Sequence, residues 1–592
     1  MAYKGKYFEI TNFGGGYAGN LPDTQLGVNQ ASDLDNIVIK EGGAGFRSRL
    51  GNQKLHLPYA TIQDLTYTAV TPGQTGSLVG VTYTPGGTAG SEIVSVSGNG
   101  IQIQIESGVS TATQVKTKFD LSAAATALAT CTVSGTGGTA QTAPVVATQL
   151  SNYTGLNSAA NVQGVGYYLQ TDADDWALAV VGNKLYQCTS SSGGAWTDIS
   201  GAITITGGAN NHWDIFTFNN EALGFGGSVT APDAPWKWTG AGNAAALGGS
   251  SPSAYGAFAA NNRVFAYRTS TNPSTMYWSI IGDADDFSGT GSGSATIGSL
   301  SDNQKVTGAV VLNTNYVLVF KENSTYQMVI STSPFPVYSL FDNVGAAGKK
   351  AIVNVDGVVY FITSDGEMKS TDGENVQSYP GHADDLWGAV TPSRYPYIVG
   401  FRERGSDYDW LVWCVTTTGS TNNKAIVWDL NNKCWLQNTT GYKFNCASQD
   451  IYGNLFCGTY TGFICRPAMT ATYGDSSEST ATITSYWQSG WMNPDSLDKV
   501  TQVRKFTAVL TPKASGSVTL AYGFDGTANS ASTTLSQVAT ASEVYLQKGA
   551  MLSGRGNTFE YKVSLASSAI DMDVQRILLS GKVYGQKGQA QD

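Results

Sequence analysis

The residue types that most often carry chemistry are scarce in this chain. Its three histidines, His56, His212 and His382, lie far apart in the sequence. Histidine is the usual general acid–base and a common zinc ligand, so the chain has few of the residues that a histidine-based catalytic or metal site would need. The sequence also has no G-x-S-x-G elbow, no P-loop and no H-E-x-x-H motif. We therefore predict no catalytic, cofactor-binding or metal-binding residues and no cofactor, and we expect that the protein is not an enzyme.

The seven cysteines do not form a recognisable framework. Five of them, Cys414, Cys434, Cys446, Cys457 and Cys465, are separated by 20, 12, 11 and 8 residues, and no C-x-x-C occurs. These spacings match no zinc site, and an odd number leaves at least one thiol unpaired. We predict that the cysteines are reduced and act as small apolar side chains in the cores of strands.

An acidic motif recurs three times. It reads DADDW at Asp172–Trp176, DADDF at Asp283–Phe287 and HADDLW at His382–Trp387. Clustered carboxylates could hold calcium through oxygen ligands, although none of the three has EF-hand spacing. The favoured interpretation is a turn in which Asp accepts hydrogen bonds from its own backbone while the aromatic residue enters the core.

One segment is similar to the turn of sialidase-type propellers. SSSGGAW (Ser190–Trp196) is the nearest match to S-x-D-x-G-x-x-W, but Ser192 stands in place of the aspartate and the tryptophan arrives one position early. A pair of carboxylates for glycoside hydrolysis is defined by its separation in space, so the sequence cannot identify one.

Composition excludes several classes of protein. The chain has 592 residues, which at roughly 100–200 per domain suggests three or four domains. Charged residues make up 13%, hydrophobic residues 41%, and the net charge is −10. This composition excludes an intrinsically disordered chain and a protein that binds nucleic acid through a basic surface. No run of 18 apolar residues predicts a membrane span, and the start of the chain lacks the apolar region of a secretory signal.

A turn followed by a short apolar strand repeats along the middle of the chain. The mean interval between its copies is 45 residues, and periods of about 40–50 residues indicate β-propeller blades. We predict six to eight blades, with a run of hairpins in β-sandwiches as the alternative. The copies are GNKLYQC from Gly182, NNEALGFG from Asn219, NNRVFAYR from Asn261, NTNYVLVF from Asn313, VDGVVYFI from Val355, DYDWLVWC from Asp407 and YGNLFCGT from Tyr452.

The predicted fold class is all-β, divided into four regions. Residues 1–60 form an N-terminal segment with the first strands, 61–165 a small inserted α+β module, 166–470 the propeller, and 471–592 a C-terminal β-sandwich. In the module, Ile93–Gly108 alternates like a hairpin and Ser110 is predicted to cap a helix that carries Gln114. The C-terminal region contains four alternating strands, KFTAVLTPK, GSVTLAYGFDG, TFEYKVSLA and VQRILLSGKVYG.

Several stretches together resemble one family, the tail nozzle and stabilisation proteins of short-tailed bacteriophages. The opening, Asn12–Gln53, is similar to the N-terminus of that family, and three later stretches follow in the family's order. These are Asn261–Gly289, Val317–Met328 with Val358–Gly373, and Ser485–Gly526, while Thr68–Ala125 resembles a small module of phage tail proteins. The matching N-terminal positions are Asn12, Phe13, Gly14, Gly15, Leu34, Asn36, Arg49 and Gly51.

The resemblance implies a structural virion protein. A homo-oligomeric ring, usually of six copies, would close the tail channel, contact the adaptor protein through the N-terminal segment, carry fibres or spikes, and conduct genomic DNA without binding it tightly. It implies assembly in the bacterial cytoplasm and a final location in the virion tail. Net acidity suits DNA transit, and abundant aromatics suit large interfaces. The alternatives are a distal receptor- or glycan-binding propeller, with or without hydrolase activity, and another tail or head–tail component.

Overall fold

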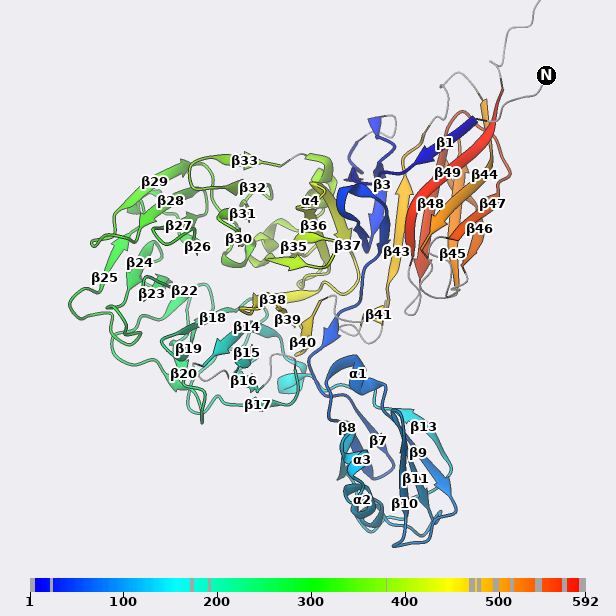
Figure 1. Ribbon diagram of the computed structural model, residues 1–592. Coiled ribbons are helices and arrows are strands. Elements are labelled where there is room, and N and C mark those ends of the chain that lie inside the picture. Colours follow the sequence, from blue (N-terminus) through cyan, green and yellow to red (C-terminus); the bar gives the residue numbers. More distant parts are fainter. Residues whose placement is uncertain are drawn as a thin grey trace, which may run out of the picture.

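Three bodies make up the computed structural model: a disc of β-sheets, a β-sandwich beside it, and a small module that projects from the disc (Figure 1). The structure describes residues 6–21, 25–170, 175–189, 193–379, 381–467, 474–475, 481–492, 500–511, 516–537, 546–566 and 572–584.

The disc is a β-propeller with seven four-stranded antiparallel blades. This number lies within the predicted six to eight. The first strand of each blade packs against the first strands of its neighbours, and β14 contacts both β18 and β38, so the ring is closed. One blade alone leaves both of its sheet faces open, and closure buries them against the next blade. Blades 1 to 3 are β14 (Val162–Leu169), β15 (Asp175–Val181), β16 (Lys184–Cys188) and β17 (Trp196–Asp198); β18 (His212–Phe218), β19 (Glu221–Gly227), β20 (Trp236–Trp238) and β21 (Ala245–Ala246); and β22 (Ala254–Ala260), β23 (Arg263–Thr269), β24 (Thr275–Trp278) and β25 (Gly293–Thr296).

Blades 4 to 6 follow the same order. They are β26 (Val306–Val311), β27 (Tyr316–Lys321), β28 (Ser324–Val329) and β29 (Val337–Asp342); β30 (Ile352–Val355), β31 (Val358–Ile362), β32 (Met368–Thr371) and β33 (Val376–Ser378); and β34 (Val399–Arg404), β35 (Asp409–Val415), β36 (Lys424–Asp429) and β37 (Cys434–Asn438). Short helices lie between these strands: η4 (Leu300–Asp302), η5 (Lys349–Ala351), η6 (Gly381–Ala383), α4 (Asp384–Gly388) and η7 (Pro392–Tyr397).

Blade 7 combines strands from the two ends of the chain. Its inner strands are β38 (Phe444–Gln449), β39 (Leu455–Thr459) and β40 (Ile464–Arg466), and its outermost strand is β6 (Gln53–Lys54). Lys54 pairs with Cys465 and Gln53 with Arg466 in antiparallel register. The N-terminal part of the chain therefore closes the ring, which the predicted propeller bounds of 166–470 did not include.

The repeated turn that predicted the propeller joins the first and second strands of blades 2 to 7. In blades 2 and 3 it is an Asn-Asn pair with left-handed backbone, φ 47° and 61° at Asn219 and Asn220. Two consecutive residues with positive φ form the tight turn that suits the twist of a hairpin, and asparagine tolerates that conformation. The copy at Gly182 was misassigned, since it joins the second and third strands of blade 1. The equivalent turn of blade 1 follows Leu169, and 171–174 lie outside the described residues.

The inserted module follows the closing strand directly. It contains two sheets, β10-β11-β9-β13 and β12-β8-β7, around a core of its own. The predicted hairpin is confirmed as β10 and β11, but the helix cap is Thr111 rather than Ser110: Thr111 and Gln114 form a reciprocal capping box, and the predicted helix is split in two. The elements are β7 (Tyr59–Ile62), β8 (Leu65–Ala69), α1 (Gly73–Ser77), β9 (Gly80–Pro85), β10 (Ile93–Ser97), β11 (Gly100–Ile105), α2 (Ala112–Asp120), α3 (Ala123–Thr126), β12 (Ala129–Val133) and β13 (Val145–Gln149), and η3 (Leu156–Ala159) leads into blade 1.

The C-terminal sandwich is built from both ends of the chain. One sheet has the order β4-β5-β49-β44-β47, with β1 also paired to β49. The four strands predicted in this region are present as β44, β45, β48 and β49. The predicted N-terminal segment is thus not a region of its own: β1 to β5 belong to the sandwich and to the sheet that joins it to the propeller, and β6 belongs to blade 7. The strands are β1 (Lys6–Ile10), β2 (Gly16–Tyr17), β3 (Gln30–Asp35), β4 (Ile37–Ile39), β5 (Phe46–Ser48), β43 (Thr484–Ser489), β44 (Val500–Leu510), β45 (Gly516–Phe524), β46 (Thr527–Gln537), β47 (Leu546–Met551), β48 (Phe559–Ala566) and β49 (Asp573–Tyr584); η2 (Glu41–Gly43), β41 (Gly474–Asp475) and β42 (Ala481–Thr482) lie between them.

One ten-stranded sheet joins the propeller to the sandwich. Blade 6 continues from β37 through β2 and β3 into β43, β48, β45 and β46. Tyr17 pairs with Trp435 at the point where the propeller ends. A single hydrophobic core extends across this junction, so the two bodies are packed together rather than linked by a loose connection. Among the described residues, no helix is both long enough and apolar enough to cross a bilayer.

Candidate functional site: the propeller channel

The first strands of the blades surround a central cavity of about 530 Å³. Lys349, in η5 before blade 5, crosses this channel. Its Nζ donates to the backbone oxygens of His212 at 3.0 Å and Tyr255 at 2.6 Å, which belong to blades 2 and 3. Nζ also lies 3.0 Å from Oδ2 of Asp214. One buried ammonium group therefore ties three blades together at the centre of the ring.

Burial and neighbouring charges shift the pKa values of the groups in this cluster. Burial lowers the pKa of Lys349 to about 8, although the neighbouring Asp214 carboxylate opposes that shift. Burial disfavours the charged form of Asp214 as well, but Lys349 and Lys350 outweigh it and hold its pKa below the usual value. Nζ of Lys350 lies 2.8 Å from the other carboxylate oxygen of Asp214. Asp214 thus balances two lysines, and the channel carries a net positive cluster.

His212 lies beside the cluster and is held neutral. Burial, followed by the charge of Lys349, lowers its pKa to about 3. Its Nε2 is 3.4 Å from Oδ1 of Asn445 in blade 7. His56 is buried at the ring closure, where its Nε2 accepts from the backbone N–H of Ile464 at 3.0 Å, and burial lowers its pKa to about 3. Neither histidine is in a state to exchange protons near neutral pH.

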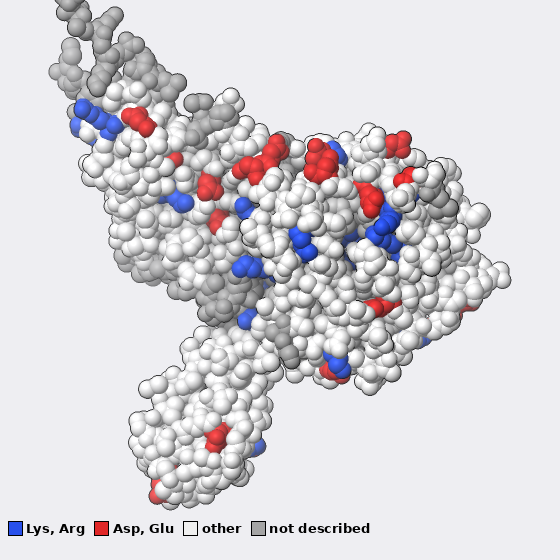
Figure 2. Space-filling model, turned by 180° about the vertical axis from the view of Figure 1, so that it is seen from behind, with Lys and Arg blue, Asp and Glu red and all other residues white. Residues whose placement is uncertain are grey.

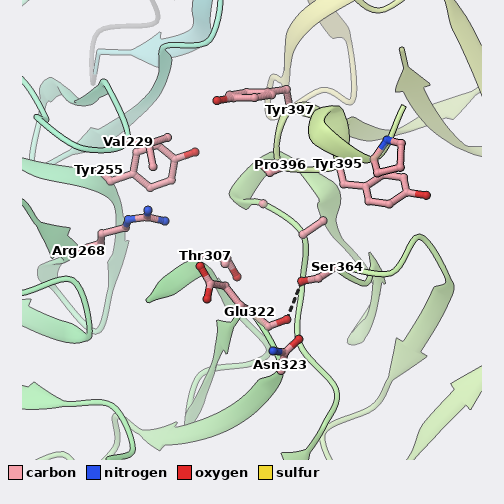
Figure 3. Close-up of a pocket in the computed structure, with 13 residues that line it drawn as sticks. Val229, Tyr255, Arg268, Thr307, Glu322, Asn323, Ser364, Tyr395, Pro396 and Tyr397 are labelled. Atoms are coloured by element: carbon pink, nitrogen blue, oxygen red, sulfur yellow. Dashed lines mark hydrogen bonds between the residues drawn. The ribbon is translucent and has the colours of Figure 1, made fainter. Parts of the chain in front are cut away.

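A pocket of about 400 Å³ opens at one mouth of the channel, which we call the mouth pocket (Figure 3). Arg268, in β23, points into it with its guanidinium 5.1 Å from the centre of the Tyr255 ring, and Nη1 donates to the backbone oxygen of Val306 at 3.1 Å. Glu322 lies across the pocket, and its backbone oxygen accepts from Ser364 Oγ at 2.6 Å. The pocket is lined by Val229, Tyr255, Arg268, Thr307, Glu322, Asn323, Ala347, Gly348, Ser364, Pro392, Tyr395, Pro396 and Tyr397.

The acidic motifs predicted from the sequence have different surroundings. In Asp283–Phe287, Asp283 and Asp286 accept hydrogen bonds from backbone N–H groups two or three residues later, and the Phe287 ring packs against a core cluster. That prediction of a turn is confirmed. In His382–Trp387 the predicted turn is wrong, because Asp384 and Asp385 begin the helix α4 and Asp385 accepts from the Tyr17 hydroxyl, but Trp387 does enter the core as predicted. In the remaining copy, Asp172–Trp176, the residues Asp172 to Asp174 lie outside the described residues.

No three His, Cys, Asp or Glu side chains come together as possible metal ligands within the described ranges. The segment resembling a sialidase turn is described from Gly193 onward. Its Trp196 donates from Nε1 to the backbone oxygen of Leu55 at 2.9 Å and stacks on His56. Trp196 therefore packs against the residues that follow the closing strand.

All seven cysteines are buried, lie in strands and form no disulfide, as predicted. Burial raises the pKa of Cys131, Cys414 and Cys446 to about 12. These thiols therefore act as core side chains and are poor nucleophiles.

Sequence reasoning missed the channel residues Asp214, Lys349, Lys350 and Arg268. The one available signal was the Lys349–Lys350 pair inside the run GAAGKKAIV, an unusual place for two charges in a chain with few of them. Gly348 precedes the pair because a Cβ there would lie 2.3 Å from the backbone oxygen of Pro396. The close approach of η7 to η5 requires glycine at that position.

Comparisons with known proteins support the fold alone. No protein-family model matches the sequence, and no curated protein matches it either. Among solved structures, YCF48 bound to D1 peptide is similar at 12% identity and a TM-score of 0.35, covering 53% of this chain and 94% of that one. The WD40 β-propeller domain of Doa1 is similar at 12% identity and a TM-score of 0.36, covering 54% and 96%. YCF48 from Cyanidioschyzon merolae has 10% identity and a TM-score of 0.35, covering 53% and 96%.

Proposed function

We propose that the protein is a structural subunit of the nozzle ring at the end of a short bacteriophage tail. The observation that carries the proposal is the meeting of the family-like N-terminal residues at one place, the junction of propeller and sandwich. These residues are spread over 40 positions of the sequence, yet they contact the same two bodies. The motif residues therefore hold the propeller and the sandwich in a fixed arrangement, and a structural tail component needs such rigidity.

Arg49 is the centre of this junction and is 2% exposed. It donates from Nε to Oδ1 of Asn36 at 3.2 Å and also donates to the backbone oxygen of Thr440, between blades 6 and 7. Asn36, whose backbone is left-handed at φ 52°, donates from Nδ2 to the backbone oxygen of Thr484 at 3.0 Å, at the start of β43. The Arg49–Asn36 pair thus connects the propeller to the sandwich through buried hydrogen bonds.

Other motif residues pack at the same junction. Phe13 lies edge-on to Phe46 and Trp487, with ring centres 5.0 and 5.3 Å away. Leu34 is fully buried beside them in the shared core. Gly15 lies so close to β3 that a Cβ would be 2.6 Å from the backbone oxygen of Asn29. These contacts give a physical reason for the residue types in the motif.

In this proposal DNA passes between copies of the chain. Each propeller's own channel is crossed by Lys349 and is far too small for a duplex. The net charge of −10 then disfavours tight binding of phosphate along the passage. Charged side chains are sparse over the face in Figure 2, and the projecting module carries few of them. Surfaces poor in charge are suited to the buried centres of subunit interfaces.

The test is the mass and shape of the purified full-length chain. Mass photometry should give a species of six copies, either alone or with adaptor protein, and negative-stain images should show a ring. Mass spectrometry of virions should recover the chain with the tail. A chain that stays monomeric with adaptor and is absent from virions would contradict the proposal. A chain found on fibres at the tip would favour the alternative of a distal receptor-binding protein.

A further inference from the structure

We propose that the mouth pocket binds a neutral saccharide unit. This inference does not depend on the nozzle proposal, because it rests on the chemistry of the pocket alone. The pocket of about 400 Å³ falls within the usual range for small-ligand sites. It combines two opposite charges with aromatic and proline walls, and these features together select the ligand.

The two charges face the pocket without pairing. Arg268 is 8% exposed and makes one hydrogen bond, from Nη1 to Val306. Figure 3 shows Arg268 and Glu322 directed into the space between them. Within the described part of the chain, no ion pair joins these two side chains, and the Glu322 carboxylate has no hydrogen-bond partner. A guanidinium that is nine-tenths buried and offers free N–H donors to a cavity is costly unless a ligand or water accepts from it.

A neutral group that both donates and accepts suits this arrangement best. The Arg268 guanidinium can only donate, and the Glu322 carboxylate can only accept. An anion would pair with Arg268 but be repelled by Glu322, and a cation would meet the reverse situation. A sugar hydroxyl satisfies both sides at once, because it donates to the carboxylate and accepts from the guanidinium without bringing a net charge into the pocket.

The walls suit the apolar faces of a sugar ring. Tyr255 and Tyr397 present aromatic rings, while Val229 and Pro396 add aliphatic surface (Figure 3). The C–H face of a pyranose packs on such surfaces, and its hydroxyl edge stays free for polar partners. Apolar walls with a few convergent polar groups are the general form of small-molecule sites.

The backbone around Arg268 is held in an unfavourable conformation. Arg268 has φ 59°, in the left-handed region that arginine rarely adopts. Such strain persists where the surrounding structure imposes it, often at binding sites. Here it directs the guanidinium into the pocket, so the donor is preorganised for a ligand.

Saturation-transfer NMR on the full-length protein tests the inference. The probes are D-glucose, D-galactose, N-acetyl-D-glucosamine and maltose, with acetate and glycine as anionic and zwitterionic comparisons that also carry C–H protons. We expect transfer to at least one saccharide and none to acetate or glycine. Arg268→Asn should weaken binding roughly tenfold or more, and asparagine accepts the left-handed backbone, so folding is preserved.

Matched variants keep the result interpretable. Glu322→Gln should also weaken binding, because the amide loses the charged acceptor while keeping its size. Arg404→Asn is the control, since Arg404 lies at the opposite end of the channel and should leave binding unchanged. Three outcomes overturn the proposal: no transfer to any saccharide at tens of millimolar, saccharide binding that survives both pocket variants, or binding of acetate or glycine in place of saccharides.

Discussion

Replacing Lys349 with methionine tests whether the cross-channel contact stabilises the ring. The ammonium makes hydrogen bonds to blades 2 and 3 and pairs with Asp214, all of them buried. Removing one partner of a buried ion pair costs about 3–5 kcal/mol. Asp214 keeps Lys350 as a partner, so we expect the lower end, about 3 kcal/mol. For amides in β18 and β22 that exchange through opening of the ring, this loss corresponds to roughly 100-fold faster hydrogen exchange.

Hydrogen-exchange mass spectrometry reads those strands separately from the sandwich, which matters in a chain of several bodies that need not unfold together. Lys369→Met is the control, because Lys369 pairs with Glu367, whose side chain is 60% exposed, and such pairs contribute about 0–1 kcal/mol. The double variant Lys349→Met with Asp214→Asn should recover part of the loss. If exchange in β18 and β22 stays within about threefold of the control, the contact does not hold the ring and the reasoning fails.

Three further outcomes follow from the buried groups. His56 and His212 each have a pKa of about 3 in the folded state, against about 6.5 in the unfolded state. The stability that they contribute should therefore be full above pH 6.5 and should fall as the pH drops toward 3, by about 2 kcal/mol per histidine at pH 5. Asp35 partly offsets this loss, because its raised pKa of about 6 makes the folded state gain stability as the pH falls from about 6 to 4. Denaturant midpoints against pH would measure this, and a His212→Gln variant with an unchanged pH slope would speak against it. Arg49→Met should destabilise the junction by about 3 kcal/mol and make hydrogen exchange in β43 faster. Arg404→Met should do neither, because the Arg404 side chain is half exposed. Equal hydrogen exchange in the two variants would show that Arg49 does not hold the junction together. Native protein should leave all seven thiols unreacted with a thiol reagent at pH 8 until denaturant is added, and fast labelling of the folded chain would contradict their burial.

The propeller was predictable from the sequence because most blades repeat the same kind of tight turn between their first and second strands. Asn-Asn and Asp-Gly turns between the first and second strands need left-handed backbone, and that requirement leaves a visible signal. The seventh blade was harder, because its outer strand β6 is two residues long, and Lys54 in that strand lies 411 positions from its partner Cys465. β46 was missed for a different reason: its sequence TANSASTTLSQ is polar, and only pairing with β45 makes it a strand.

The channel and the mouth pocket could not be predicted in the same way. Lys349 meets Asp214 across 135 positions, and the pocket is assembled from four blades and a short helix. Arg268 and Glu322 lie inside the family-like stretches Asn261–Gly289 and Val317–Met328, but nothing in those stretches assigned either residue to a pocket. What the sequence offered was a family-like order of motifs, and Arg49, Asn36 and Phe13 are explained by the junction that they build.

The pairing of the first strand with the last has a consequence for biosynthesis. Phe8 in β1 lies opposite Leu579 in β49, so its partner is made 571 residues later. At about 5–20 residues per second, the ribosome needs about 30–110 s to supply it. During that time the amino-terminal strands, including the one that seals the ring, have open edges in a crowded cell. We expect the nascent chain to depend on holdase chaperones, and a circular permutant that begins at the module to mature faster.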